Sequence, residues 1–158
     1  MKYCLFLLTS LILFFAHAQE NQSLNTYTFA EAEQLQEEEE RPYFIFIHTD
    51  WCRYCLGMRN NVFTNPSVIK ILNKSFYLII FNAENEEDVF FSGRSFLFKP
   101  NGKNTGIHEL ADALGNIDGK LTFPSSVILL PKNEITFQYG GFIPGDELLE
   151  LLETTLSK

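Results

Sequence analysis

The chain has 158 residues, of which 46% are hydrophobic and 20% charged, and its formal net charge is −8. This length suits one ordinary domain that buries its own core, and nothing in the sequence indicates a second domain. The acidic balance argues against nucleic acid as a partner, because phosphate backbones attract basic surfaces. We interpret the two acidic blocks, Glu37–Glu40 and Glu84–Asp88, as solvated helix ends or loops.

The first 18 residues have the pattern of an export signal. Lys2 precedes an apolar stretch from Leu5 to Phe15, and Ala16-His17-Ala18 matches an A-x-A cleavage site. The stretch is shorter than the roughly 20 residues that a membrane-spanning helix needs. We therefore expect a signal peptide over residues 1–18, with an uncleaved anchor as the alternative. After cleavage, we expect an exported chain that is not stably inserted in a membrane. Residues 19–26 are polar and are expected to form a linker.

The next segments predict helices and strands in alternation. Thr28 and Glu31 form a capping-box pattern at the start of a first helix, which we expect to end near Glu40. The apolar run Tyr43–His48 predicts a strand, because it is rich in aromatic and β-branched residues. A helix that begins at Cys52 is expected to follow this strand directly.

A second helix–strand pair comes after the cysteines. Asn65 followed by Pro66 is a helix start signal, with a capping residue and then proline at the first helical position. Phe76–Phe81 predicts the next strand, which we expect inside the sheet rather than at a wet edge because it is uniformly apolar. Two buried strands separated by a helix predict a right-handed βαβ unit with parallel strands.

The second half of the chain has a different pattern. Ser126–Leu130 and Ile135–Tyr139 predict a β-hairpin, and Asp146–Leu156 predicts an amphipathic terminal helix capped by Asp146. Residues 84–122, between the two halves, form a longer connection than this order needs, and they include a short helix pattern at His108–Leu114. This insert either selects partners or packs over the sheet.

Cys52 and Cys55 are the candidate catalytic residues. Cys4 lies in the export signal, so these two are the cysteines expected in the mature chain. At the start of a helix, a spacing of three residues puts both sulfurs on one face of the first turn, close enough to form a disulfide. The helix N-terminus and the cation of Arg53 favour the thiolate of Cys52, so the expected role of Arg53 is to tune the pKa of that thiol.

A redox-active dithiol competes with three other interpretations of this pair. A structural crosslink would close a very short loop and would remove only about 2 kcal/mol of chain entropy from the unfolded state. Haem attachment would need a histidine where Leu56 follows Cys55. A zinc site would need two further ligands, for which His48 and His108 are the candidates. We expect no metal and no cofactor.

The motif Trp51-Cys52-Arg53-Tyr54-Cys55 behind a strand, together with Phe123-Pro124 just before the hairpin, resembles the thioredoxin superfamily. The resemblance is to exported bacterial members with a helical insert ahead of the proline, and it covers about residues 27–158. It implies an α/β thioredoxin-like fold, a three-layer sandwich with a central mixed sheet. It also implies a cis peptide bond before Pro124, and substrate-binding roles for Trp51, Phe123 and Pro124.

By the same resemblance, the expected function is thiol–disulfide exchange in the periplasm of a Gram-negative bacterium, with reduction as the expected direction. Cys52, which we expect to be exposed, attacks a substrate sulfur, and Cys55 then resolves the mixed disulfide. The expected partners are cysteine-containing client proteins and an unidentified redox partner, and we expect a monomer.

Two positions depart from the pattern of cytosolic thioredoxins. Those proteins carry a buried aspartate and a lysine that help to move the proton of the resolving thiol, and this chain has Phe46 and Ile80 in their places. The proton path would then run through water or through His48, Asp50 or Glu84. A non-catalytic binding module with a thioredoxin fold is the alternative function.

Overall fold

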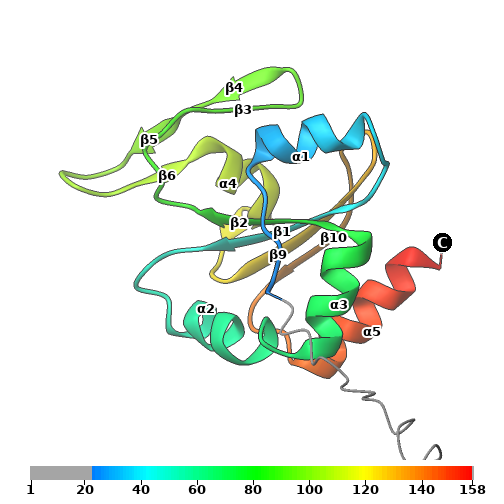
Figure 1. Ribbon diagram of the computed structural model, residues 1–158. Helices are drawn as coiled ribbons and strands as arrows, with labels where there is room; N and C mark the ends of the chain where they lie inside the picture. Colours follow the sequence, from blue (N-terminus) through cyan, green and yellow to red (C-terminus); the bar gives the residue numbers. More distant parts are fainter. Residues whose placement is uncertain (1–22, 158) are drawn as a thin grey trace, which may run out of the picture.

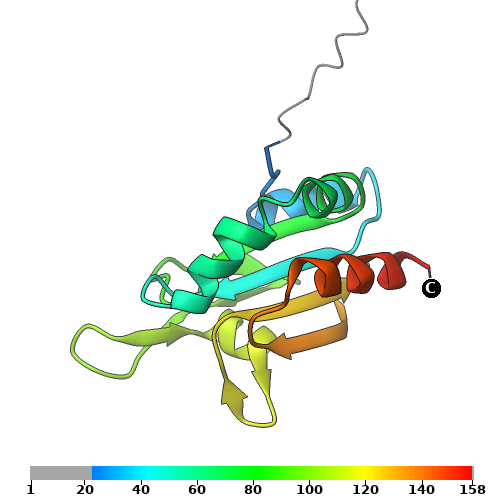
Figure 2. The same ribbon diagram turned by 90° about the horizontal axis from the view of Figure 1, so that it is seen from below.

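A four-stranded mixed sheet lies at the centre of the molecule, with helices on both faces (Figure 1 and Figure 2). The computed structural model describes residues 23–157, so the predicted signal peptide and half of the predicted linker lie outside the described residues. Within residues 23–157, no helix combines the length and the apolar character needed to cross a membrane.

The helices are α1 (Phe29–Gln36), α2 (Arg53–Gly57), α3 (Pro66–Ser75), α4 (Glu109–Gly115) and α5 (Gly145–Leu156), and a π-helical turn, η1 (Met58–Val62), continues α2. The central sheet contains β1 (Tyr43–His48), β2 (Tyr77–Asn82), β9 (Ser125–Leu130) and β10 (Glu134–Gly140). Three short hairpins pair β3 (Val89–Phe91) with β4 (Arg94–Phe96), β5 (Phe98–Pro100) with β6 (Gly106–His108), and β7 (Asn116–Ile117) with β8 (Lys120–Leu121).

The sheet order is β10-β9-β1-β2. β1 and β2 are parallel, β9 is antiparallel to β1, and β10 is antiparallel to β9. The predicted α/β thioredoxin-like architecture is therefore confirmed. The prediction that the second strand lies inside the sheet was wrong, because β2 is an edge strand. Helices cover both of its faces, and this burial accounts for its apolar sequence without a neighbour on the outer side.

The central strand β1 is buried along its whole length because the sheet has a core on each face. Tyr43, Ile45 and Ile47 point into the core beneath α1 and α4, whereas Phe44 and Phe46 point into the core against α3 and α5. Side chains alternate between the two faces of a strand, so a strand covered on both sides must be apolar at every position. Figure 1 shows α1 and α4 above the sheet and α2, α3 and α5 below it.

Several element boundaries differ from the predictions. α1 begins after Thr28, which forms the predicted capping box with Glu31, but it ends at Gln36 rather than near Glu40. The helix expected to begin at Cys52 begins at Arg53, with Cys52 as its N-cap, and a π-helical turn over Met58–Val62 continues it. α5 begins at Gly145, after Pro144, so Asp146 lies in the first turn and is not the capping residue.

The insert packs against the sheet. α4 contributes Leu110, Ala111 and Leu114 to the same core as α1, and β3 contributes Phe91. His108, the residue before α4, is fully buried and caps that helix through Nδ1, which accepts the backbone N–H of Leu110 at 3.1 Å. These contacts favour the interpretation of residues 84–122 as a packed excursion over the sheet.

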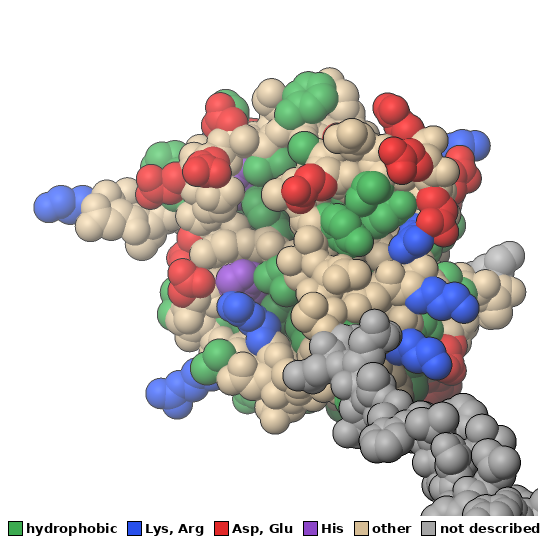
Figure 3. Space-filling model, viewed as in Figure 1, with side chains coloured by type: hydrophobic (Ala, Val, Ile, Leu, Met, Phe, Trp, Pro, Cys, Tyr) green, Lys and Arg blue, Asp and Glu red, His purple; other side chains and the backbone are tan. Residues whose placement is uncertain are grey.

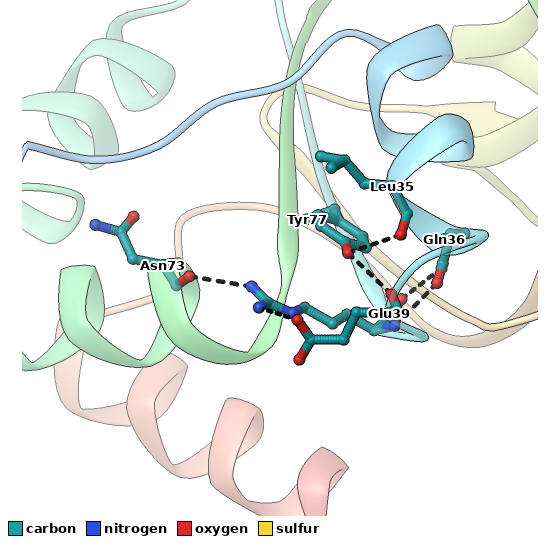
Figure 4. Close-up of polar contacts among 6 residues, drawn as sticks. Leu35, Gln36, Glu39, Asn73 and Tyr77 are labelled. Carbon is teal, nitrogen blue, oxygen red and sulfur yellow. Dashed lines mark hydrogen bonds and ion pairs between the residues drawn. The ribbon is translucent and has the colours of Figure 1, made fainter.

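A polar cluster joins the ends of α1 and α3 to β2 (Figure 4). The Arg41 guanidinium pairs with the Glu39 carboxylate and donates to the Asn73 carbonyl at 3.3 Å. The Tyr77 hydroxyl lies 2.9 Å from the Glu39 carbonyl and 3.2 Å from that of Leu35. The cluster thus ties the turn after α1 to the end of α3 and to β2.

Replacing Tyr77 by phenylalanine should destabilise the fold modestly. Tyr77→Phe keeps the ring but removes the hydroxyl that donates to the Glu39 carbonyl, whereas the Leu35 carbonyl keeps the backbone N–H groups of Glu38 and Glu39 as donors. We expect the free energy of unfolding, measured by urea denaturation, to fall by about 1 kcal/mol. Tyr54→Phe is the matched control, because the Tyr54 side chain is exposed. Equal stability of the two variants would show that the cluster contributes nothing.

Candidate active site

Cys52 and Cys55 form a disulfide at the point where β1 has ended and α2 begins. Their Cα atoms are 5.2 Å apart. Cys52 is the N-cap residue of α2, and its Sγ accepts a hydrogen bond of 3.0 Å from the backbone N–H of Cys55. In the reduced protein the same N–H and the positive end of the helix would stabilise a thiolate at Cys52.

Both sulfurs of the oxidised protein are buried. Cys52 is 6% exposed and Cys55 is 2% exposed, and both belong to the core on the α3 and α5 side of the sheet. The expectation that Cys52 is exposed was therefore wrong for this oxidised state, because the bond to the deeply buried Cys55 holds its sulfur against the core.

The loop before β9 lies beside the disulfide. Its Phe123–Pro124 peptide bond is cis, and the Phe123 ring packs against the core that contains both cysteines. Phe123 also meets the indole of Trp51 edge to face, with 5.9 Å between the ring centroids. The structure thus brings Trp51 next to Phe123 and Pro124, which lie far from it in the sequence.

The backbone of this loop is held on one side and free on the other. The Pro124 carbonyl accepts the Gly141 N–H at 2.8 Å. A side chain at position 140 would overlap the Thr122 hydroxyl, so the glycine at this position allows β10 to pass close to the loop. Among residues 23–157, no backbone hydrogen bond uses the N–H or the carbonyl of Phe123. An extended peptide can therefore pair with the Phe123 backbone.

Glu84 is a site residue whose contact with Trp51 was not foreseen. Its carboxylate accepts the indole N–H of Trp51, at 3.1 Å to one oxygen and 3.2 Å to the other. Glu84 follows β2, so the end of this strand fixes the orientation of a side chain that is 66% exposed. The sequence carries no signal for this contact, because 33 residues separate the partners.

The described surroundings of the cysteines are mostly apolar. Phe46 is fully buried in the same core, and Ile80 packs against that core. Arg53 is exposed at the start of α2 and forms no ion pair within residues 23–157. Ser126, also missed by the sequence analysis, lies opposite Phe46 in the β1–β9 register and has a buried hydroxyl without a partner in the described protein.

The two described histidines do not assemble a metal site with the cysteines. His108 Nε2 lies 3.2 Å from the Glu87 carbonyl, and its other nitrogen caps α4. His48 stacks on Phe46 with 6.1 Å between ring centroids. Residues 23–157 contain no group of three or more His, Cys, Asp and Glu side chains placed to hold a metal ion.

His48, the last residue of β1, is a buried titratable side chain. Burial lowers its pKa below the ordinary value of 6.5, and the positive charge of Arg59 acts in the same direction. Asp50, whose Oδ1 lies 3.9 Å from His48 Nδ1, opposes the shift. Burial likewise lowers the pKa of His108. The folded protein therefore disfavours the charged form of both rings.

The stability of the oxidised protein should fall as the pH drops below about 6.5. The unfolded chain binds protons at a higher pH than the folded chain, so acid favours unfolding through this window. Urea denaturation at about pH 7.5 and about pH 5.5 measures the loss. We expect His48→Asn and His108→Asn each to reduce this loss, and Asn can still cap α4. An unchanged loss in both variants would contradict the assignment.

Residues 29–156 match the family model of a thioredoxin-like domain. A thioredoxin from Thermus thermophilus, solved in solution, is 23% identical, with 85% of this chain and 88% of that chain covered and a TM-score of 0.59. A DsbH oxidoreductase is 17% identical, with 85% of each chain covered and a TM-score of 0.59.

The reduced C-terminal domain of DsbD from Neisseria meningitidis is also similar, at 17% identity, with 79% of this chain and 90% of that chain covered and a TM-score of 0.54. A comparison with the curated proteins gave no match. The structural likenesses show the fold, and the family match spans most of the chain. The chain therefore belongs to the thioredoxin-like domain family, in which its Cys52–Cys55 pair makes it a thiol–disulfide oxidoreductase.

Proposed function

We propose that this protein is exported and reduces disulfides of client proteins through its Cys52–Cys55 pair. The observation that carries the proposal is the position of Cys52 Sγ at the N-cap of α2, beside a loop whose Phe123 backbone is free to pair with a client. Trp51 and Tyr54, both highly exposed next to the cysteines, supply an apolar contact surface for the client.

The proposed reaction has two exchange steps. The Cys52 thiolate attacks one sulfur of a client disulfide, which forms a mixed disulfide and releases the other client sulfur as a thiolate. The Cys55 thiolate then attacks Cys52 Sγ, which releases the second client thiolate and leaves the Cys52–Cys55 disulfide. Two electrons pass to the client, and a separate dithiol protein must reduce the pair again.

The surroundings of the sulfurs favour the reducing direction. Burial in an apolar core destabilises a thiolate, and the uncharged disulfide does not suffer this cost. The hydrogen bond from the Cys55 N–H and the charge of Arg53 act in the opposite direction, because they stabilise the Cys52 thiolate. We propose that burial outweighs them, since Phe46 and Ile80 add no charge to this core.

The proposed compartment follows from the N-terminal sequence. The pattern of residues 1–18 supports cleavage after Ala18 and a periplasmic location in a Gram-negative bacterium. In that compartment the chain would act as a monomer on cysteine-containing clients. Mass spectrometry of the protein from the envelope fraction should find Gln19 as the first residue.

Substitution of each cysteine tests the catalytic roles. In an insulin reduction assay with dithiothreitol, Cys52→Ser should reduce the rate to that of dithiothreitol alone, because it removes the attacking thiolate. Cys55→Ser should accumulate mixed disulfides between Cys52 and the client, visible on non-reducing gels. In the full-length chain with residues 1–18 retained, Cys4→Ser is the matched control and should keep the parent rate. Absence of turnover by the parent protein with reducing and oxidising partners would favour a non-catalytic binding module instead.

The reduction potential tests the direction of exchange. Trp51 is the one tryptophan of the chain and adjoins the disulfide, so its fluorescence can follow a titration with glutathione. A reductase should have a potential nearer to the roughly −270 mV of thioredoxin than to the roughly −120 mV of DsbA. A value close to the DsbA potential would show that the protein oxidises its clients.

A further inference from the structure

β2 itself carries none of the residues that usually protect an edge strand. Such strands commonly carry lysine, proline or a bulge that blocks pairing with another chain. β2 has the sequence Tyr-Leu-Ile-Ile-Phe-Asn, and it pairs with β1 at six consecutive positions without a register shift. Where other segments of the chain do not cover it, this edge is therefore open to a further strand.

The ladder shows which residues of β2 face outward. The N–H groups of Tyr77 and Ala83 donate to backbone carbonyls at the two ends of β1, so the odd-numbered residues of this segment pair with β1. In a parallel strand, the N–H and the carbonyl of one residue point to the same neighbour, and consecutive residues alternate. Leu78, Ile80 and Asn82 therefore direct their backbone groups away from β1.

The start of α1 covers only part of this edge. The Leu78 carbonyl accepts the Tyr27 N–H at 2.9 Å. Within residues 23–157, no backbone group pairs with the N–H or the carbonyl of Ile80, or with the N–H of Asn82. A peptide that lies beside Ile80 can thus form main-chain hydrogen bonds with groups that are otherwise left to water.

A groove of about 530 Å³ lies along these free groups. It is lined by the segment Tyr27–Ala30, by Ile79–Asn82 of β2, and by Asn85 and Glu87–Phe90. Glu87 and Asp88 line the groove, and none of the Lys and Arg side chains in the described part of the chain does. We name this feature the β2-edge groove.

The charge around the β2-edge groove is acidic on a wider scale. Figure 3 shows acidic side chains gathered over the segment that follows β2, with apolar side chains between them and α1. Phe90, at the rim, is 60% exposed although it is a large aromatic residue. Apolar surface framed by carboxylates suits a ligand that is itself apolar and basic.

We propose that the β2-edge groove binds an extended segment of a partner protein in which basic residues alternate with apolar ones, and that this segment joins the sheet beside β2. Main-chain hydrogen bonds to Ile80 would supply affinity, and the alternating side chains would supply specificity. Apolar side chains would enter the groove, and basic ones would meet Glu87 and Asp88.

The described start of the chain does not lead into this groove. Asn73, near the end of α3, holds the Ser23 carbonyl at 2.8 Å and the Asn25 N–H at 2.8 Å. This contact lies toward the Tyr77 end of β2, whereas the groove lies toward Asn82. The proposal also involves neither cysteine, so it does not depend on the proposed redox function.

The test uses the oxidised, ¹⁵N-labelled protein and a seven-residue peptide in which lysine alternates with valine. Titration followed by NMR should shift the amides of Ile80 and Asn82, and saturation should slow hydrogen exchange at the Ile80 amide by roughly tenfold or more. A peptide of the same sequence, N-methylated at alternate amides, is the control and should bind much more weakly because it cannot complete the ladder.

Charge reversal separates the groove from the general acidity of the protein. The double variant Glu87→Lys with Asp88→Lys should weaken the peptide affinity by roughly tenfold. Glu147→Lys with Glu150→Lys on α5 changes the net charge equally and should weaken it by less than roughly threefold, since these side chains are exposed away from the groove.

Four results of the peptide experiments would overturn the proposal. They are an absence of binding, shifts confined to Cys52 and Phe123, equal binding of the methylated peptide, and equal effects of the two double variants. Concentration-dependent dimerisation that protects the Ile80 amide without peptide would also overturn it, because the occupant would then be a second copy of the chain. Sedimentation equilibrium measures that outcome.

Discussion

The burial of β1 on both faces is the constraint on which the rest of the structure depends. A strand that is apolar at every position is stable only between two covering layers, and here α1 and α4 cover one face while α3 and α5 cover the other. The chain leaves this strand at its carboxyl end and turns directly into α2, so the disulfide lies where a rigid strand meets a helix N-terminus. The position of the sulfurs is therefore set by the core and not by a flexible loop.

The sequence predicted what local chemistry determines. Thr28 and Glu31 form their capping box, Asn65 and Pro66 start α3, and the Cys52–Cys55 spacing places a disulfide on the first helical turn. These features involve residues a few positions apart, for which side-chain type and helix geometry leave few options. Apolar patterns predicted the order of helices and strands, and the resemblance carried by the cysteine motif and by Pro124 added the mixed sheet and the cis peptide bond.

The errors arose where distant segments decide the outcome. The uniformly apolar sequence of β2 indicates that both faces of the strand are covered, but it does not indicate whether another strand pairs with its outer edge. The contact of Trp51 with Glu84 depends on how β2 ends relative to β1, which no local pattern encodes. The hairpins of the insert are a different case. Ser92-Gly93 and Asp118-Gly119 have positive φ angles and are recognisable turn sequences that the sequence analysis did not use.

The two walls of the dithiol site differ in how far they can adapt. The loop of Pro124 is fastened to β10 through the Gly141 N–H, and the close approach of Thr122 to Gly140 leaves no space for it to shift independently. The opposite wall is the indole of Trp51, which is anchored at one end by an exposed hydrogen bond to Glu84. A client of different shape would thus meet a backbone that is held in place on one side and, on the other, an exposed indole whose position depends on the contact of its N–H with the Glu84 carboxylate.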